Sequence, residues 1–220
     1  MSIDIIVWLV LTRVVARKSY NKSVFINCPI DAQYTKLFRA VVFAVLRCNY
    51  YVRCAVEEDD ASEIRLNKIL RMIEECRLGL HDLSRTEIDT RSRLPRFNMP
   101  FELGLFLAAK YFGCDEHDRK VCLVFEKKKH SYEALISDIK GQDIVAHGNK
   151  PRIMVIRVRN WLASNGTGGP QLKGGHAVWN DYIAFQRWLP RECRRHDLKD
   201  RDLTFGDYVN LVYQWIETHD

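Results

Sequence analysis

The sequence predicts an α/β fold in which a parallel β-sheet is covered by helices on both faces. Short runs rich in β-branched and aromatic residues alternate along the chain with longer segments whose apolar residues recur at helical spacing. Strands that alternate with helices in this way form parallel sheets, because each helix carries the chain back to the same end of the sheet.

The first predicted strand is residues 23–28, a run that Pro29 ends before a loop. A helix follows at 34–46, where apolar residues recur at helical spacing. Residues 50–56 then predict a second strand, and the four acidic residues 57–60 form its exit loop.

A second helix and a third strand are predicted at 64–73 and 77–83, and a long loop follows at 84–97. The next helix is expected to start at Asn98 as its N-cap, with Pro100 in the first helical position. Its apolar residues continue to residue 112.

The same alternation continues with a strand at 120–125, a helix at 132–139 and a short strand at 143–146. Three further helices are expected at 153–162, 179–188 and 205–216, with a glycine-rich break after the first of them. That break contains no G-x-x-x-x-G-K-[ST] motif, so we do not interpret it as a phosphate-binding P-loop. The chain divides into an N-terminal arm at 1–22, an α/β domain at 23–163 and a helical C-terminal extension at 164–220 that packs on the domain.

Composition indicates a soluble globular protein with enough residues for one full core. The chain has 220 residues, of which 47% are hydrophobic and 28% charged, and this excludes general disorder. Seven scattered cysteines, none in a C-x-x-C pair, predict the reduced thiols of a cytoplasmic protein and neither a disulfide framework nor a metal site.

The apolar segment at 3–11 is too short to span a bilayer, which takes about 20 residues, and it lacks the flanks of a signal peptide. We interpret it as an arm that docks on the domain or on another subunit, which predicts a homo-oligomer and no membrane association. The alternative is a membrane-surface role, for which the basic residues Arg13, Arg17 and Lys18 are the only support.

The net charge of +6 and the pI near 8.9 permit anionic ligands without identifying one. Much of the positive charge lies in the tail, at Arg152, Arg157, Arg159, Arg187, Arg191, Arg194 and Arg195. A solvated helical face is the default interpretation. Nucleic-acid binding through this tail stays an alternative, although no motif indicates it.

Polar residues recur where the predicted strands end and the next helices begin. In parallel sheets, ligands bind at this edge, near the point where the strand order reverses. We therefore expect a site built from Asn27, Glu57, Asp82, Ser84, Asn98 and Glu102. Glu102 is expected in the opening turn of its helix, where the helix dipole favours an ionised carboxylate.

Three segments carry a family resemblance: Val24-Phe25-Ile26-Asn27-Cys28-Pro29, His81-Asp82-Leu83-Ser84 and Asn98-Met99-Pro100-Phe101-Glu102-Leu103-Gly104. They resemble the nucleoside 2-deoxyribosyltransferase-like branch of the TIR-related superfamily, roughly over residues 23–146. The resemblance implies a flavodoxin-like (Rossmannoid) sheet and a glutamate that attacks or stabilises C1′ of a ribosyl group while the base leaves. On this basis Glu102 and Asp82 are the expected catalytic residues. The expected substrate-binding residues are Asn27, Cys28, Ser84, Arg96, Asn98 and Phe101.

The chain departs from the base-exchanging enzymes of that branch. Residues 98–100 stand where those enzymes carry an acidic, glycine-containing turn, and the tail differs from the segment that completes their site. The deoxyribosyltransferase-like effectors of bacterial antiphage systems, including retron-associated ones, are more similar. That resemblance implies N-glycosidic cleavage of NAD or a related nucleotide.

We therefore predict a cytoplasmic N-glycosyl hydrolase, similar to an NAD glycohydrolase, that acts as a toxic effector in antiphage defence together with partner components. NAD is the expected substrate, and no cofactor is expected. The alternatives are a nucleoside or nucleotide 2-deoxyribosyltransferase and a non-catalytic, TIR-like module for nucleotide binding or assembly. Nicotinamide leaves as a neutral base without a general acid, whereas adenine needs a proton donor, a role open to Asp82 if its pKa is raised. The arginines of the long loop, Arg85, Arg91, Arg93 and Arg96, match a pyrophosphate.

Overall fold

The computed structural model describes residues 19–85, 96–134, 136–166 and 171–219, and within them lies one five-stranded parallel sheet. Its strands are β1 (Ser23–Asn27), β2 (Tyr51–Cys54), β3 (Leu78–Asp82), β4 (Val121–Glu126) and β5 (Val145–Ala146). They lie in the order β2-β1-β3-β4-β5, which is the strand order of flavodoxin-like sheets. The predicted fold class is therefore confirmed.

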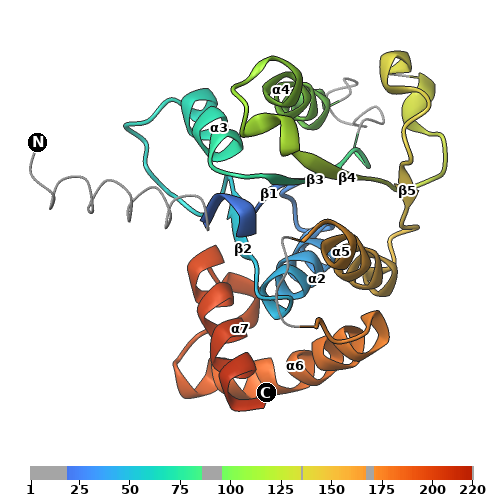
Figure 1. The fold of residues 1–220 in the computed structure, drawn as a ribbon. Coiled ribbons are helices and arrows are strands. Elements are labelled where there is room, and N and C mark those ends of the chain that lie inside the picture. The colour runs from blue at the N-terminus through green and yellow to red at the C-terminus, as the bar shows by residue number, and fades with distance from the viewer. Residues whose placement is uncertain (1–18, 86–95, 135, 167–170, 220) are drawn as a thin grey trace, which may run out of the picture.

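Helices cover both faces of the sheet, and two further helices add an outer layer (Figure 1). On one face lie α3 (Arg65–Glu74) and α4 (Asn98–Phe112), and on the other lie α2 (Thr35–Arg47) and α5 (Pro151–Asn165). The C-terminal helices α6 (Gly175–Arg195) and α7 (Phe205–His219) pack on α2 and α5. The predicted helical extension therefore packs mainly on the helices α2 and α5.

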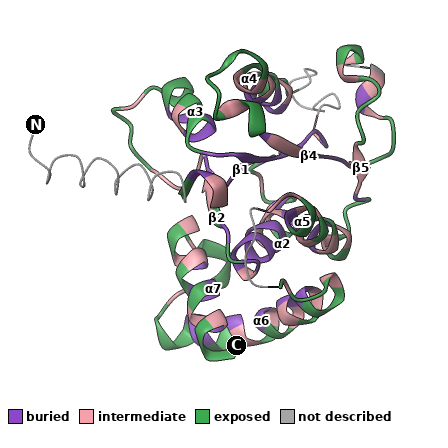
Figure 2. Cartoon of the chain, viewed as in Figure 1, coloured by how far each residue is buried: buried purple, intermediate pink, exposed green. Residues whose placement is uncertain are grey.

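The helix α2 is central because its sequence is apolar almost all round. Every residue from Ala40 to Leu46 is buried, and Figure 2 shows the helix in purple between the sheet and the outer layer. Its Phe43 ring lies 5.1–5.6 Å from the rings of Tyr182, Phe185 and Trp215, measured between centroids. A helix that is apolar on all sides is stable only when both sides are covered, and α6 and α7 provide the second cover.

The other face of the sheet has a smaller core around Phe25, Met72 and Phe106. Gly79 in β3 permits its close packing, because a Cβ at this position would lie 2.7 Å from the Phe106 ring and 2.8 Å from Nε2 of His81. The sheet and α4 are thus in close contact where β3 approaches the candidate site.

One predicted helix is wrong. Residues 132–139 form two short 3₁₀ turns, Tyr132–Ala134 and Ser137–Ile139, and no α-helix. The buried Glu126 carboxylate accepts the backbone N–H groups of His130 at 2.7 Å and Ser131 at 2.9 Å, while His130 has a positive φ of 66°. These contacts fix a turn at the point where a helix would have to begin. Two further 3₁₀ turns lie at His117–Arg119 and Asp200–Asp202.

The predicted arm at residues 3–11 lies outside the described residues. Within the part of the chain that the structure describes, no helix combines the length and apolar character needed to cross a membrane. All seven cysteines are free.

Candidate active site

The site forms where the strand order of the sheet reverses. From β1 the chain moves to β2 on one side, then returns to β3 on the other, so the carboxyl ends of β1 and β3 flank the switch point. Asn27 ends β1, Asp82 ends β3, and Asn27 lies opposite His81 in the register. Two of the predicted site residues therefore lie on adjacent strands at the edge where such folds bind ligands.

Asn27 joins this edge to α4. Its side-chain nitrogen donates one hydrogen bond to the backbone carbonyl of Met99 at 2.8 Å and contacts Nδ1 of His81 at 3.0 Å. Since the amide donates, Nδ1 of His81 is the acceptor, and the ring proton lies on Nε2. Burial lowers the pKa of His81 to about 3, so the ring is neutral. Both amide hydrogens of Asn27 are used within the protein.

The contact with Met99 fixes which side of α4 faces the sheet. Met99, Glu102, Leu103 and Phe106 are the buried residues of the helix, and their spacing of three and four places them on one face. Glu102 therefore lies one turn beyond the carbonyl that Asn27 holds, on the face that points inward.

The start of α4 differs from the prediction. The helix begins at Asn98, Phe97 occupies the N-cap position without a side-chain cap, and Pro100 is the third helical residue. Phe97 already has helical backbone angles, and its carbonyl accepts the N–H of Phe101 at 2.9 Å, so the helix starts earlier than expected. The helix dipole acts most strongly on the opening turn. Glu102 is the fifth helical residue and lies beyond that turn.

Burial controls the protonation of Glu102. The residue is only 6% exposed, and burial raises the pKa of its carboxyl group to about 7, although the charge of Arg65 acts in the opposite direction. Among the described residues, no hydrogen-bond or ion-pair partner of this carboxylate is present. Glu102 is therefore a carboxylate with a high pKa and no counter-ion, in contrast to the expected dipole-stabilised one.

Asp82 lies in the opposite situation, because three donors satisfy its fully buried carboxylate. The Tyr34 hydroxyl donates to Oδ2 at 2.5 Å, Nε2 of His147 lies 3.1 Å from the same oxygen, and the N–H of Ser84 donates to Oδ1 at 2.8 Å. Burial opposes ionisation, but the hydrogen bonds from His147, Ser84 and Tyr34 outweigh it and lower the pKa of Asp82. Asp82 is therefore ionised at neutral pH, and the raised pKa that a proton donor requires is not present.

Ser84, His147 and Asp82 do not form a nucleophilic triad. Ser84 Oγ lies 2.7 Å from His147 Nε2, the same nitrogen that contacts Asp82, while His147 Nδ1 accepts the backbone N–H of Asn149 at 2.9 Å. A triad needs the serine on one ring nitrogen and the carboxylate on the other. Here Nε2 carries the ring proton and cannot accept one from Ser84, so this cluster positions β3 and the loop after it.

Cys28 lies among the carboxylates of the site. Burial raises the pKa of its thiol well above the usual value, and the charges of Asp82, Glu102 and Asp31 raise it further. These three carboxylates therefore lie within the range of charge–charge interaction with the Cys28 thiol at the end of β1. The thiol is protonated, which makes Cys28 a small buried residue and a poor nucleophile.

The remaining predicted residues lie near the surface. Arg96 and Arg85 both bind Asp31, at 3.5 Å and 3.1 Å, and the same carboxylate accepts the N–H groups that precede α2. Asn98 and Phe101 are exposed at the start of α4. Arg91 and Arg93 lie outside the described residues.

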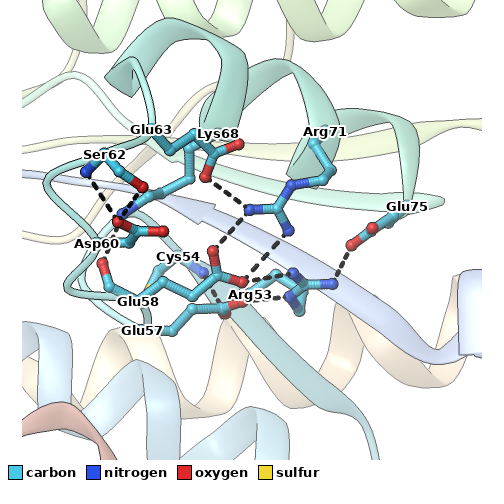
Figure 3. Close-up of polar contacts among 10 residues, drawn as sticks. All are labelled: Arg53, Cys54, Glu57, Glu58, Asp60, Ser62, Glu63, Lys68, Arg71 and Glu75. Carbon is cyan, nitrogen blue, oxygen red and sulfur yellow. Dashed lines mark hydrogen bonds and ion pairs between the residues drawn. The ribbon is translucent and has the colours of Figure 1, made fainter.

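Glu57 does not join the site, because arginines bind the acidic loop after β2 (Figure 3). Arg53 Nε lies 2.5 Å from Glu57, and Arg71 lies 2.6 Å from Glu58 and 2.9 Å from Glu63. These ion pairs hold the loop against α3 and neutralise part of its charge, which indicates a structural role.

Two residues of the site were not predicted, Tyr34 and His147. The helical spacing predicts Tyr34 as the first apolar residue of the helix; in the structure it is the N-cap residue of α2 and its ring joins the core, and nothing in the pattern indicates the contact of its hydroxyl with Asp82. His147 directly follows β5, so the rule that selected Asp82 at a strand end would also have selected His147. The described residues contain no group of three or more His, Cys, Asp or Glu side chains placed to hold a metal ion.

Comparisons with family models, with curated proteins and with solved structures find no match for the chain.

Proposed function

We propose that the protein hydrolyses the N-glycosidic bond between ribose and base in NAD or a related nucleotide, with Glu102 as the catalytic carboxylate. One observation supports this above the others: a buried carboxylate without a counter-ion lies at the switch point of a flavodoxin-like sheet. The residue is only 6% exposed, yet its carboxylate oxygens are not among the buried polar atoms that lack a partner in the described part of the chain, so the carboxylate reaches solvent, where a ligand can contact it.

The chemistry needs such a group. As the bond from C1′ to the base nitrogen breaks, positive charge develops on the ribosyl ring, and a nearby carboxylate stabilises or captures it. The interaction is strong because the surroundings have a low dielectric constant. A cationic ligand would also provide the positive counter-ion that Glu102 lacks. Binding of that ligand would therefore lower the pKa of Glu102 and favour its ionised form.

The state of Asp82 favours NAD over substrates with a neutral base. Adenine leaves readily only when a donor protonates it, and Asp82 has a lowered pKa and three hydrogen-bond donors around it. The nicotinamide of NAD is already cationic and leaves as a neutral molecule. In this proposal Asp82 positions the loop that follows β3 and does not transfer a proton.

Side chains near Glu102 match the other parts of a dinucleotide. Phe97 and Phe101, each 56% exposed, offer aromatic faces for a planar base at the start of α4. Arg85 and Arg96 pair with Asp31, and a pyrophosphate would compete with that carboxylate for the two guanidinium groups. The resemblance to antiphage effectors supports a role as a toxic effector that partner components hold in check.

The test is to incubate the purified full-length protein with NAD, deoxynucleotides and nucleosides and to identify released bases by chromatography. We expect nicotinamide from NAD with the wild type, none with Glu102→Gln, and wild-type release with Glu217→Gln, an exposed control on α7. Release of nicotinamide by Glu102→Gln at the wild-type rate would refute the assignment of Glu102. Absence of any released base from every substrate would favour the non-catalytic module.

A further inference from the structure

The outward face of α6 carries a stripe of arginines. Arg187, Arg191 and Arg194 are all exposed and follow one another at intervals of four and three residues, which places them on one side of the helix. The opposite side is the buried one and consists of Val178, Tyr182, Phe185, Leu189 and Cys193. Arg187, Arg191 and Arg194 are called the arginine stripe below.

The acidic residues of α6 do not neutralise the stripe. Asp181 binds Arg47 at 2.8 Å, and the buried Glu192 binds Gln214 at 2.9 Å and Arg195 at 3.2 Å. Within the described part of the chain, no ion pair or side-chain hydrogen bond involves any arginine of the stripe. The next acidic residue, Asp197, lies beyond the end of the helix.

Like charges three or four residues apart on a helix repel one another, so the stripe destabilises α6 slightly. A helix face that is only exposed to solvent usually carries charges of both signs, which keep it hydrated without this repulsion. The arrangement therefore fits a ligand that supplies several negative charges in a row.

We propose that the arginine stripe binds the phosphate backbone of a nucleic acid. Guanidinium groups bind phosphate oxygens through two parallel hydrogen bonds, and successive arginines along a helix meet successive phosphates. This surface is independent of the chemistry at Glu102. It lies in the outer helical layer, on the far side of α2 and α5 from the sheet (Figure 1).

Two other polyanionic partners fit this surface less well. An acidic protein would need apolar anchors, yet the exposed positions that precede the stripe on the same side are His176, Asn180 and Ala184. A membrane-bound helix inserts its apolar side, and that side of α6 is buried against the rest of the protein.

The experiment measures fluorescence anisotropy of a labelled mixed-sequence DNA, single-stranded and duplex, with full-length protein over a range of salt concentrations. For the duplex, the triple variant R187Q/R191Q/R194Q is expected to reduce the slope of log affinity against log salt by about 3 and the affinity at low salt by about tenfold or more. The control K36Q/R119Q/K128Q removes three exposed charges from separate places and is expected to change the affinity by less than about threefold.

Equal DNA binding by the wild type and the triple variant would overturn the proposal. Tighter binding to poly-glutamate or to anionic vesicles than to either DNA would overturn it in favour of an acidic protein or a membrane surface. Thermal unfolding of each variant checks that the fold is intact, and the single variant R191Q, with an expected slope change of about 1, provides a milder test. The arginine stripe and Glu102 lie on different parts of the protein, so Glu102→Gln should bind DNA like the wild type. The DNA-binding test therefore stays valid even if the protein does not hydrolyse NAD.

Discussion

The side-chain amide of Asn27 donates a 2.8 Å hydrogen bond to the backbone carbonyl of Met99. This contact joins the end of β1 to the first turn of α4, and Glu102 follows one helical turn later. The position of the proposed catalytic carboxylate thus depends on an amide that belongs to a different element of the fold.

The first prediction concerns this link. Asn27→Ala leaves Nδ1 of His81 without its donor and removes the contact of the Met99 carbonyl outside its own helix, so we expect a loss of roughly 1–3 kcal/mol of unfolding free energy. Urea denaturation measures the change. The exposed Asn210→Ala on α7 serves as the control, with an expected change below about 0.5 kcal/mol. An equal effect of the two substitutions would contradict the link.

The second prediction is that Glu102→Gln stabilises the protein above neutral pH. A carboxyl group with a folded-state pKa of about 7 and an ordinary value of 4.5 binds more protons in the folded state between these limits. The free energy of unfolding therefore falls by on the order of 3 kcal/mol as the pH rises from 4.5 to 7, and it is constant at higher pH. The amide does not titrate, so the advantage of the variant should grow through this window. If the difference in unfolding free energy between the variant and the wild type, measured by urea denaturation, did not change with pH, the pKa of Glu102 would not be raised in the folded state.

The third prediction concerns the rate of NAD cleavage. If Glu102 acts as an ionised carboxylate, kcat/KM should rise with pH through an inflection near 7 and then level off, because this parameter reports the free enzyme. A general acid would give the opposite limb, with kcat/KM falling above pH 7. Initial rates of nicotinamide release between pH 5 and 9 distinguish the two roles.

The fourth prediction concerns Asp82. Its lowered pKa means that it stabilises the fold above its ordinary pKa and that this stability is lost as the pH falls through the folded-state pKa. Tyr34→Phe removes one donor, which should cost about 1–3 kcal/mol and shift acid unfolding to higher pH. Tyr111→Phe, at a position 71% exposed, is the control in acid titrations followed by circular dichroism. Coincident acid transitions for the two variants would argue against the role of Tyr34.

The fifth prediction separates hydrolysis from base exchange. When labelled nicotinamide is supplied together with unlabelled NAD, we expect free ADP-ribose and little label in the dinucleotide pool. A transferase must exclude water while one base replaces another, and it would incorporate the label faster than free ribosyl product accumulates. That result, or the corresponding one with a deoxynucleotide and its base, would favour the transferase alternative.

The sequence was sufficient for the fold because strand and helix patterns depend on local side-chain periodicity. It placed Asn27, Asp82 and Glu102 at the same edge, since strand ends can be recognised from the chain alone. It did not reveal their electrostatic states. The high pKa of Glu102 depends on burial against the sheet, and the low pKa of Asp82 depends on Tyr34 and His147, which are distant in sequence. Helix 132–139 was wrong because Glu126, a residue outside the segment, fixes its turn.

The outer layer of helices has a consequence for synthesis of the protein. The Tyr208 hydroxyl on α7 donates to the Arg39 carbonyl on α2 across 169 positions of the chain, and Trp215 packs on Phe43. During translation the sheet-facing side of α2 can find its partners long before α7 leaves the ribosome. Until then α6 covers only part of the second apolar side of α2, so a nascent chain that stalls before α7 leaves apolar surface around Phe43 exposed, to which chaperones or other stalled chains can bind.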